Sequence, residues 1–221
     1  PDPAGSLRFL LNEGEGRFAE ATEAAGLGVK TPVLSLGAAD LDLDGVDDLL
    51  LGTPALAPDR VFLNRGGAGF REASVSSQSG FLDDTVAWVA GDLGGNGSTD
   101  LLTVKGGGQV RWLEATGSTA HWLRLSLPGQ AAGTRLAISA RDSDWVLRTT
   151  QHVLGLEPTI TVGLGAGETI ERVEVFDAAG GEALKTLETL EPDRLVVIEL
   201  PKRPAKRPVV PMASPPVAEG K

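Results

Sequence analysis

A segment of this chain recurs at a fixed spacing, and that repeat limits the folds available to it. Phe9–Thr22 is matched by Val61–Ser74, with an Asn-x-Gly turn and a later Phe-x-Glu in both copies. An acidic loop that begins at Asp40 is matched by a loop that begins at Asp92. Both matches are 52 positions apart, so two different motifs keep one period. A shared period predicts repeated supersecondary units that stack on one another.

Each unit is expected to consist of four short strands. Alternating apolar residues separated by Gly-containing turns are typical of antiparallel hairpins. In the first complete unit the expected strands are Leu34–Ala38, Asp48–Gly52, Arg60–Leu63 and Phe70–Ala73. About fifty residues with four strands is the size of a β-propeller blade. Residues 1–116 are therefore predicted to form a partial β-propeller of two to three blade-like four-stranded units.

The loop from Asp40 to Asp48 carries four carboxylates that can turn inward on one centre. They occupy its first, third, fifth and ninth positions, and a backbone carbonyl can join them from the seventh. Gly45, at the sixth position, allows the sharp turn that such a loop needs. An all-oxygen cage of high negative charge suits a hard cation with about six to eight ligands, so Ca²⁺ is expected before Mg²⁺. The candidate ligands are Asp40, Asp42, Asp44, Val46 and Asp48.

Two other interpretations of this loop are open. An EF-hand loop begins in the same way, but it needs a Glu at its twelfth position and a helix on either side. Here the twelfth residue is Leu51, and the flanking segments alternate like strands. The loop could also be a solvated acidic turn that binds nothing. Four carboxylates that can turn inward within nine residues would then repel one another without a counter-ion, which favours the metal site.

The second loop keeps only part of this ligand set. Gly94 stands where the carboxylate of the third position would be, so two charged ligands remain. This loop is expected to bind a metal ion more weakly than the first, or to stand empty and be held by turn chemistry alone. Its candidate ligands are Asp92, Asn96, Ser98 and Asp100.

The period is lost after Thr116, where a second all-β region begins. His121–Leu127 alternates cleanly and is expected to be a half-buried strand. Further strands are expected at Arg135–Ala140, Trp145–Thr150, Thr159–Leu164, Arg172–Phe176 and Leu195–Leu200. Short strands at regular spacing without helices predict a small β-sandwich or barrel over residues 117–200. Residues 201–221 are rich in Pro and Lys and are expected to form an extended tail.

Charge and cysteine content exclude several classes of function. The chain has 20 Lys and Arg against 30 Asp and Glu, a formal net charge of −10. Such an acidic chain is not expected to bind nucleic acid, because phosphate binding needs a basic surface. The absence of cysteine excludes disulfides, thiolate metal sites and cysteine nucleophiles. No apolar run has the length of a membrane span, so none is expected in this chain.

The pattern of reactive residues does not favour an enzyme. His121 and His152 are far apart, and no Ser-His-Asp order with an elbow motif is present. Gly163–Gly167 superficially suggests a phosphate-binding loop but lacks the Lys-Ser/Thr ending, so a turn is expected there. Asp83 and Asp84 could act as acid and base in a glycosidase, although a solvated turn is the better interpretation.

The acidic loop and the Phe-Leu-Asn-x-Gly turns resemble the FG-GAP/VCBS repeats of integrin-α-like propellers. The segment from His121 to Leu200 resembles the ASPIC/UnbV domain that follows such repeats in cartilage-acidic-protein-like proteins. The stretches that carry this second resemblance are His121-Trp122-Leu123, Gly163-Leu164-Gly165 and Val173–Phe176. The resemblance implies Ca²⁺ bound between strands of a blade, and an extracytoplasmic location, secreted or periplasmic.

Propellers of that family close with about seven blades, whereas this chain holds two units and a fraction. Two blades leave open edges and exposed faces. The chain also begins Pro1-Asp2-Pro3, with neither an initiator Met nor a secretion signal, which suggests a piece of a longer protein. We therefore expect a non-enzymatic, Ca²⁺-stabilised binding or scaffold protein, a subunit or fragment that contacts other protein chains of a larger assembly. The alternative is an accessory or carbohydrate-binding part of a secreted hydrolase.

Overall fold

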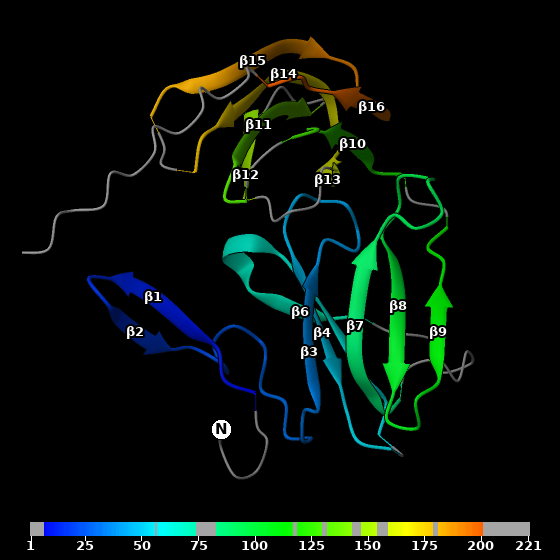
Figure 1. The fold of residues 1–221 in the computed structure, drawn as a ribbon. Coiled ribbons are helices and arrows are strands. Elements are labelled where there is room, and N and C mark those ends of the chain that lie inside the picture. Colours follow the sequence, from blue (N-terminus) through cyan, green and yellow to red (C-terminus); the bar gives the residue numbers. More distant parts are fainter. Residues whose placement is uncertain are drawn as a thin grey trace, which may run out of the picture.

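The computed structural model is all-β, as the sequence predicts, and consists of several small sheets (Figure 1). It describes residues 7–55, 57–73, 83–116, 119–129, 132–142, 147–153, 159–178 and 181–200. Within these residues no sheet closes on itself, and the one helical element is the 3-10 turn η1 (Gly66–Ala68). The tail expected at 201–221 lies outside the described residues.

The first complete unit is an antiparallel four-stranded sheet. Its strands, in their order across the sheet, are β3 (Ser35–Ala39), β4 (Asp48–Gly52), β5 (Arg60–Asn64) and β6 (Phe70–Glu72). These bounds agree with the predicted strands to within one residue. Successive residues of a strand point to opposite faces of its sheet, and both Leu50 and Leu51 of β4 are fully buried. Both faces of this sheet are therefore covered around β4.

A three-stranded antiparallel sheet lies beside the first one. Its strands are β7 (Thr85–Gly91), β8 (Asp100–Lys105) and β9 (Val110–Leu113). Strands β3 and β7 run side by side in Figure 1, and Ser35 Oγ donates a hydrogen bond to the carbonyl of Thr85 at 2.6 Å. The indole Nε1 of Trp88 donates to Ser35 Oγ at 3.0 Å. Gly37 leaves room for the Trp88 ring, since a Cβ at Gly37 would stand 3.2 Å from Trp88 Cβ.

An N-terminal hairpin repeats the turn that connects β5 and β6. Its strands are β1 (Leu10–Gly14) and β2 (Arg17–Glu20). The N–H of Gly14 donates to Asn12 Oδ1 at 2.9 Å, and the N–H of Gly66 donates to Asn64 Oδ1 at 3.0 Å. The ring of Phe9, just before β1, meets the ring of Phe70 edge-on. A small core lies beside this contact and consists of Leu27, Val29, Leu51 and Phe62.

The remaining strands form two further sheets that share one core. The three-stranded sheet, in the order β13-β10-β16, contains β13 (Thr159–Gly165), β10 (His121–Ser126) and β16 (Arg194–Val197). The four-stranded sheet, in the order β12-β11-β14-β15, contains β12 (Leu147–Val153), β11 (Arg135–Asp142), β14 (Gly167–Phe176) and β15 (Ala183–Leu190). Both sheets bury apolar side chains in one cluster, which includes Leu123, Leu125, Leu136, Ile138, Val162, Ile170, Val173 and Val175. The two sheets thus contribute to a single apolar core.

Figure 1 shows the β10–β16 sheets at one end of the strands β3, β4, β7 and β8. At that end lie the β3–β4 connection and the β7–β8 connection, which are the two acidic loops of the sequence. The fold thus gathers both loops against β10 and β13.

Candidate metal centre

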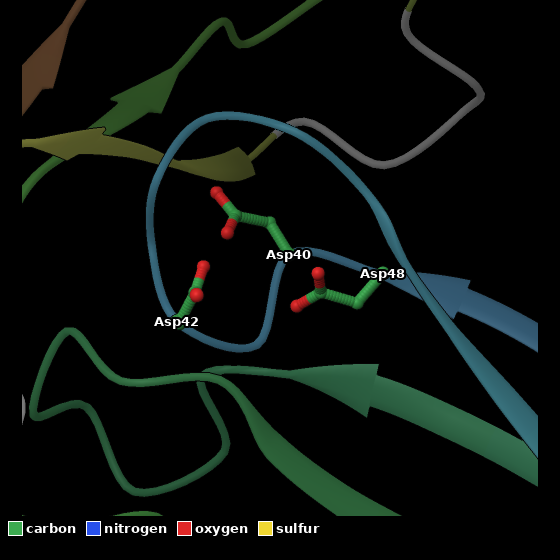
Figure 2. Close-up of side chains that lie close together, drawn as sticks. All are labelled: Asp40, Asp42 and Asp48. Carbon is green, nitrogen blue, oxygen red and sulfur yellow. The ribbon is translucent and has the colours of Figure 1, made fainter. Parts of the chain in front are cut away.

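Three carboxylates of the first loop lie together in the connection between β3 and β4. Asp40, Asp42 and Asp48 each offer an oxygen atom, and these three atoms lie within 4.8 Å of one another. Figure 2 shows the three side chains within the curl of the loop. Hairpin pairing places Ala39 opposite Asp48, so the end of β3 and the start of β4 hold the first and last carboxylates close to each other.

Backbone N–H groups shape the loop by donating to these carboxylates. Asp40 accepts the N–H of Asp44 at 3.1 Å and the N–H of Gly45 at 3.0 Å. The fully buried Asp48 accepts the N–H of Leu41 at 3.0 Å and the N–H of Asn64 at 2.7 Å. Gly45 has a φ of +88°, a left-handed conformation that glycine adopts without steric cost. The predicted glycine turn is therefore present.

The loop holds more negative charge than its surroundings balance. Burial raises the pKa of Asp40, the Gly45 N–H opposes the rise and the neighbouring carboxylates add to it, and together these effects bring the pKa to about 7. Burial likewise raises the pKa of Asp48 to about 6, although the N–H groups of Asn64 and Leu41 oppose the rise. Raised pKa values mean that these carboxylates accept a proton more readily than free aspartate does. A bound cation would compete with that proton for the same oxygen atoms.

The two other predicted ligands lie at the edge of this cluster. Asp44 accepts the N–H of Val46 on its Oδ1 at 3.0 Å, and its Oδ2 lies 3.8 Å from Nη1 of Arg65. Val46 is 39% exposed, so its side chain takes no part in the core. The structure thus brings Asp40, Asp42 and Asp48 together and leaves Asp44 turned toward an arginine.

Arg65 is the member of the site that the sequence analysis missed. It follows β5, and its Nη1 donates to Oδ2 of Asp42 at 3.0 Å. The other oxygen of Asp42 is buried and accepts no hydrogen bond within the described part of the chain. Arg65 directly follows Asn64, whose N–H binds Asp48, so the turn after β5 brings the arginine beside the acidic loop. The arginine supplies one positive charge to a loop of five carboxylates.

The residues present fit a hard divalent cation. The clustered donors are all carboxylate oxygens, which suit Ca²⁺, Mg²⁺ or Mn²⁺ rather than metals that prefer thiolate or imidazole. The buried oxygen of Asp42 that accepts no hydrogen bond is an available ligand atom. Asp40, Asp42 and Asp48 are therefore the residues that would hold the ion.

The second loop has backbone hydrogen bonds equivalent to those of the first loop. Asp92 accepts the N–H of Asn96 at 3.0 Å and of Gly97 at 2.8 Å. Asp100 accepts the N–H of Leu93 at 3.0 Å and of Ala115 at 2.8 Å. These bonds mirror those made by the two end carboxylates of the first loop.

The electrostatics of the second loop differ from those of the first. Burial pushes the pKa of Asp100 upward, but hydrogen bonds from Ala115, Gly94 and Leu93 outweigh it, so the pKa lies below its ordinary value. Asn96 Oδ1 accepts the N–H of Ser98 at 2.9 Å, so this candidate ligand atom is bound within the loop. Backbone N–H groups of the protein thus stabilise the anionic form of Asp100.

The other reactive residues considered from the sequence have structural partners. His121 Nδ1 lies 2.7 Å from an oxygen of Asp193. Asp83 pairs with Lys105, so the Asp83-Asp84 pair is not an isolated pair of carboxylates. Gly163 and Gly165 end strand β13, and the chain turns directly into β14. The side chain of His152 lies outside the described residues.

No family model matches this sequence, and no curated protein matches it either. In the residues that the structure describes, no helix is long and apolar enough to cross a membrane.

Proposed function

We propose that this chain is a non-enzymatic binding or scaffold protein, stabilised by Ca²⁺, that works as a subunit or fragment of a larger extracytoplasmic assembly. The observation that carries the proposal is the cluster of Asp40, Asp42 and Asp48 in the connection between two adjacent strands. The location follows from the resemblance to FG-GAP/VCBS repeats alone.

Ca²⁺ is proposed because the loop brings several carboxylate oxygens together. Mg²⁺ demands near-ideal octahedral geometry and keeps several waters, whereas Ca²⁺ accepts irregular sets of six to eight oxygens. The three clustered carboxylates provide the first ligands. Asp44 and the carbonyl of Val46 are proposed to complete the protein's share of the shell.

The role of the ion would be structural. Asp40 follows β3 and Asp48 begins β4, so a cation between them ties the ends of two paired strands. It would also neutralise carboxylates that otherwise repel one another in a buried position. Because the ion binds the folded loop and not the unfolded chain, its binding free energy adds to the stability of the fold.

An uncovered sheet face supports contact with other protein chains. Trp88 of β7 points toward the first sheet, so the next residue, Val89, points away from it. Cross-strand pairing places Leu102 and then Trp112 on that same outer face. Val89 is 55% exposed and Trp112 is 54% exposed. Exposed apolar sheet faces of this kind mark interaction surfaces.

The partner proposed for this face is a further sheet, as in a propeller. Within the chain, the face of the first sheet that contains Gly37 and Leu50 is covered by Trp88 of the following sheet. Val89 and Leu102 stand 52 residues after Gly37 and Leu50. By the same stacking, a further blade-like unit from the assembly would cover Val89 and Leu102.

A chelation experiment tests the metal site. The melting temperature of the chain is measured in EGTA and in excess Ca²⁺, with Mg²⁺ as a comparison. Ca²⁺ at about one hundred times its Kd is expected to add roughly 2.7 kcal/mol to the free energy of unfolding. Asp42→Asn is expected to remove this gain, because it replaces a clustered carboxylate by a neutral side chain.

Asp47→Asn is the matched control, since it removes the same charge from an exposed side chain of the same loop that is not in the cluster. It should keep the full Ca²⁺ response. Equal melting temperatures of the unmodified chain in EGTA and in Ca²⁺ would refute the site.

A further inference from the structure

The second acidic loop receives its positive charge from a strand of another sheet. The side chain of Asp92 is 2% exposed and pairs with the guanidinium of Arg124 on β10. Arg124 Nε also donates to Thr161 Oγ1 on β13 at 3.2 Å, which orients the side chain. A carboxylate buried to this degree needs a close counter-charge, because an unpaired buried charge is strongly destabilising. Arg124 therefore gives this loop the compensation that a metal ion would give the first loop.

A second contact fixes the same loop to β10. Gly97 lies directly under the indole of Trp122, since a Cβ at Gly97 would stand 2.1 Å from Trp122 Nε1. The guanidinium of Arg124 lies over the Trp122 ring, 5.6 Å from its centroid. Loop and strand thus meet through one ion pair and one aromatic contact.

The first loop is seated on the adjacent strand β13. The carbonyl of Leu43 accepts the N–H of Gly165 at 2.6 Å, and the side chain of Leu43 is buried. A Cβ at Gly163 would stand 2.2 Å from Oδ2 of Asp40, so the strand passes against this carboxylate. Leu43 itself stands between Asp42 and Asp44 in sequence. The segment that would bind the ion is therefore the segment that contacts β13.

Both loops border one cleft. It has a volume of about 600 Å³, and its walls include Asp40 and Leu43 of the first loop, Asp92 of the second, and Arg124 and Val162 of the facing strands. The contact of the first loop with β13 and that of the second loop with β10 are thus parts of a single contact region between the loops and the β10–β16 sheets.

We propose that the two loops form one platform for the β10–β16 sheets, in which Arg124 supplies the cation of the second loop and a divalent ion supplies that of the first. The inference rests on the proposed Ca²⁺ site. Residues 40–44 take part in ion binding and in the contact with β13. Ion binding therefore orders the surface that contacts β13, and the contact with β13 orders the ion site. Thermodynamic linkage then requires each event to strengthen the other by the same factor.

The test is to replace the arginine that pairs with the second loop and to measure Ca²⁺ binding at the first loop. Arg124→Gln removes the ion pair with Asp92 and leaves every residue of the first loop unchanged. Isothermal titration of Ca²⁺ into the full chain is expected to show one bound ion per chain. The substitution is expected to raise the Kd for Ca²⁺ by about five-fold or more. Arg141→Gln is the control, since Arg141 of β11 pairs with Glu171 of β14 within the β10–β16 sheets. It removes the same charge and should leave the Kd unchanged.

Amide hydrogen exchange gives an independent readout. Ca²⁺ should slow exchange of the Gly165 N–H in the unmodified chain and slow it less in Arg124→Gln, because that N–H donates across the contact. If Arg124→Gln does not fold, the double variant Asp92→Asn/Arg124→Gln removes both charges of the pair and is measured in its place.

An unchanged Kd in the variant, or two ions bound per unmodified chain, would overturn the platform. Failure of the proposed function has a different signature, because the unmodified chain would then bind no Ca²⁺ at all.

Discussion

The backbone N–H of Asn64, at the end of β5, donates to Oδ1 of Asp48, at the start of β4, at 2.7 Å. The same carboxylate accepts the N–H of Leu41 from the acidic loop. The loop and the Asn-x-Gly turn are thus parts of one hydrogen-bonded unit. In the second unit Asp100 accepts the N–H of Ala115 in the same way. In both units the last aspartate of the acidic loop thus joins the loop to the end of the strand that follows β4 or β8.

Replacement of Asp48 by alanine is expected to lower the free energy of unfolding by about 2–4 kcal/mol even in EGTA. Two N–H groups lose their acceptor, and an unsatisfied buried group costs roughly 1–3 kcal/mol. Asp48→Asn keeps an acceptor oxygen and should lose at most about half as much, while abolishing the response to Ca²⁺. Urea denaturation in EGTA and in Ca²⁺ measures both effects. Equal losses in the two variants would argue against the role of these hydrogen bonds.

The chelated protein is expected to become less stable as the pH rises from 5 to 8. Asp40 has a pKa of about 7 when folded, against an ordinary value of 3.8. Between these values the folded state binds more protons than the unfolded state, so stability falls with rising pH and levels off above the folded pKa. Melting temperatures in EGTA at pH 5.5 and 8 measure the change. Asp40→Asn should flatten it, and excess Ca²⁺ should restore stability at pH 8.

The sequence predicts the first four-stranded unit well because its period and its strand pattern agree, whereas the second sheet has three strands in the described residues instead of the expected four. The strand bounds follow from alternation and from glycine turns, and the backbone bonds of the loops follow from the aspartates at their ends. Asp40 and Asp92 each accept the N–H groups four and five residues later. These are local interactions, which a pattern of nearby residues specifies.

The strand β15 was not predicted, and β14 begins five residues before its predicted start at Arg172. The apolar residues of β15, Leu184, Leu187 and Leu190, are three apart, which does not match the alternation of a strand. The structure pairs Leu187 with Val173 and Leu190 with Ile170. The pairing of β11 with β14 shifts register between those two residues of β14, so buried positions can be three apart. A bulge of this kind is set by neighbouring strands and is not visible in one segment.

The two arginines of the loops were also missed, because each comes from a distant element. Arg65 reaches Asp42 from the turn after β5, and Arg124 reaches Asp92 from β10. Their partners are fixed only when the sheets have packed. The sequence therefore predicts the aspartates of each loop but not the arginine that pairs with them.

Arg65→Gln is expected to lower the melting temperature in EGTA and to enlarge the gain on addition of Ca²⁺. The arginine partly neutralises Asp42 and lies near Asp44, so its loss leaves more negative charge for the ion to balance. Differential scanning calorimetry with and without Ca²⁺ measures the two effects. Arg71→Gln, on the exposed surface of β6, is the control. A smaller Ca²⁺ gain in Arg65→Gln would mean that Arg65 assists the ion site rather than competes with it.

The exposed outer face of the β7–β9 sheet is expected to make the isolated chain self-associate. Val89 and Val110 are 55% and 60% exposed on this face, and sheet faces left without a partner tend to pair with other apolar surfaces. Val89→Lys combined with Val110→Lys should lower the association constant measured by sedimentation velocity, with little change in melting temperature, because neither side chain is buried. Leu195→Lys, which introduces the same charge at an exposed position of β16, should not change association. If all three proteins sediment alike as monomers, this face does not bind a further sheet on its own. The assembly proposed here would then have to form through another surface of the chain.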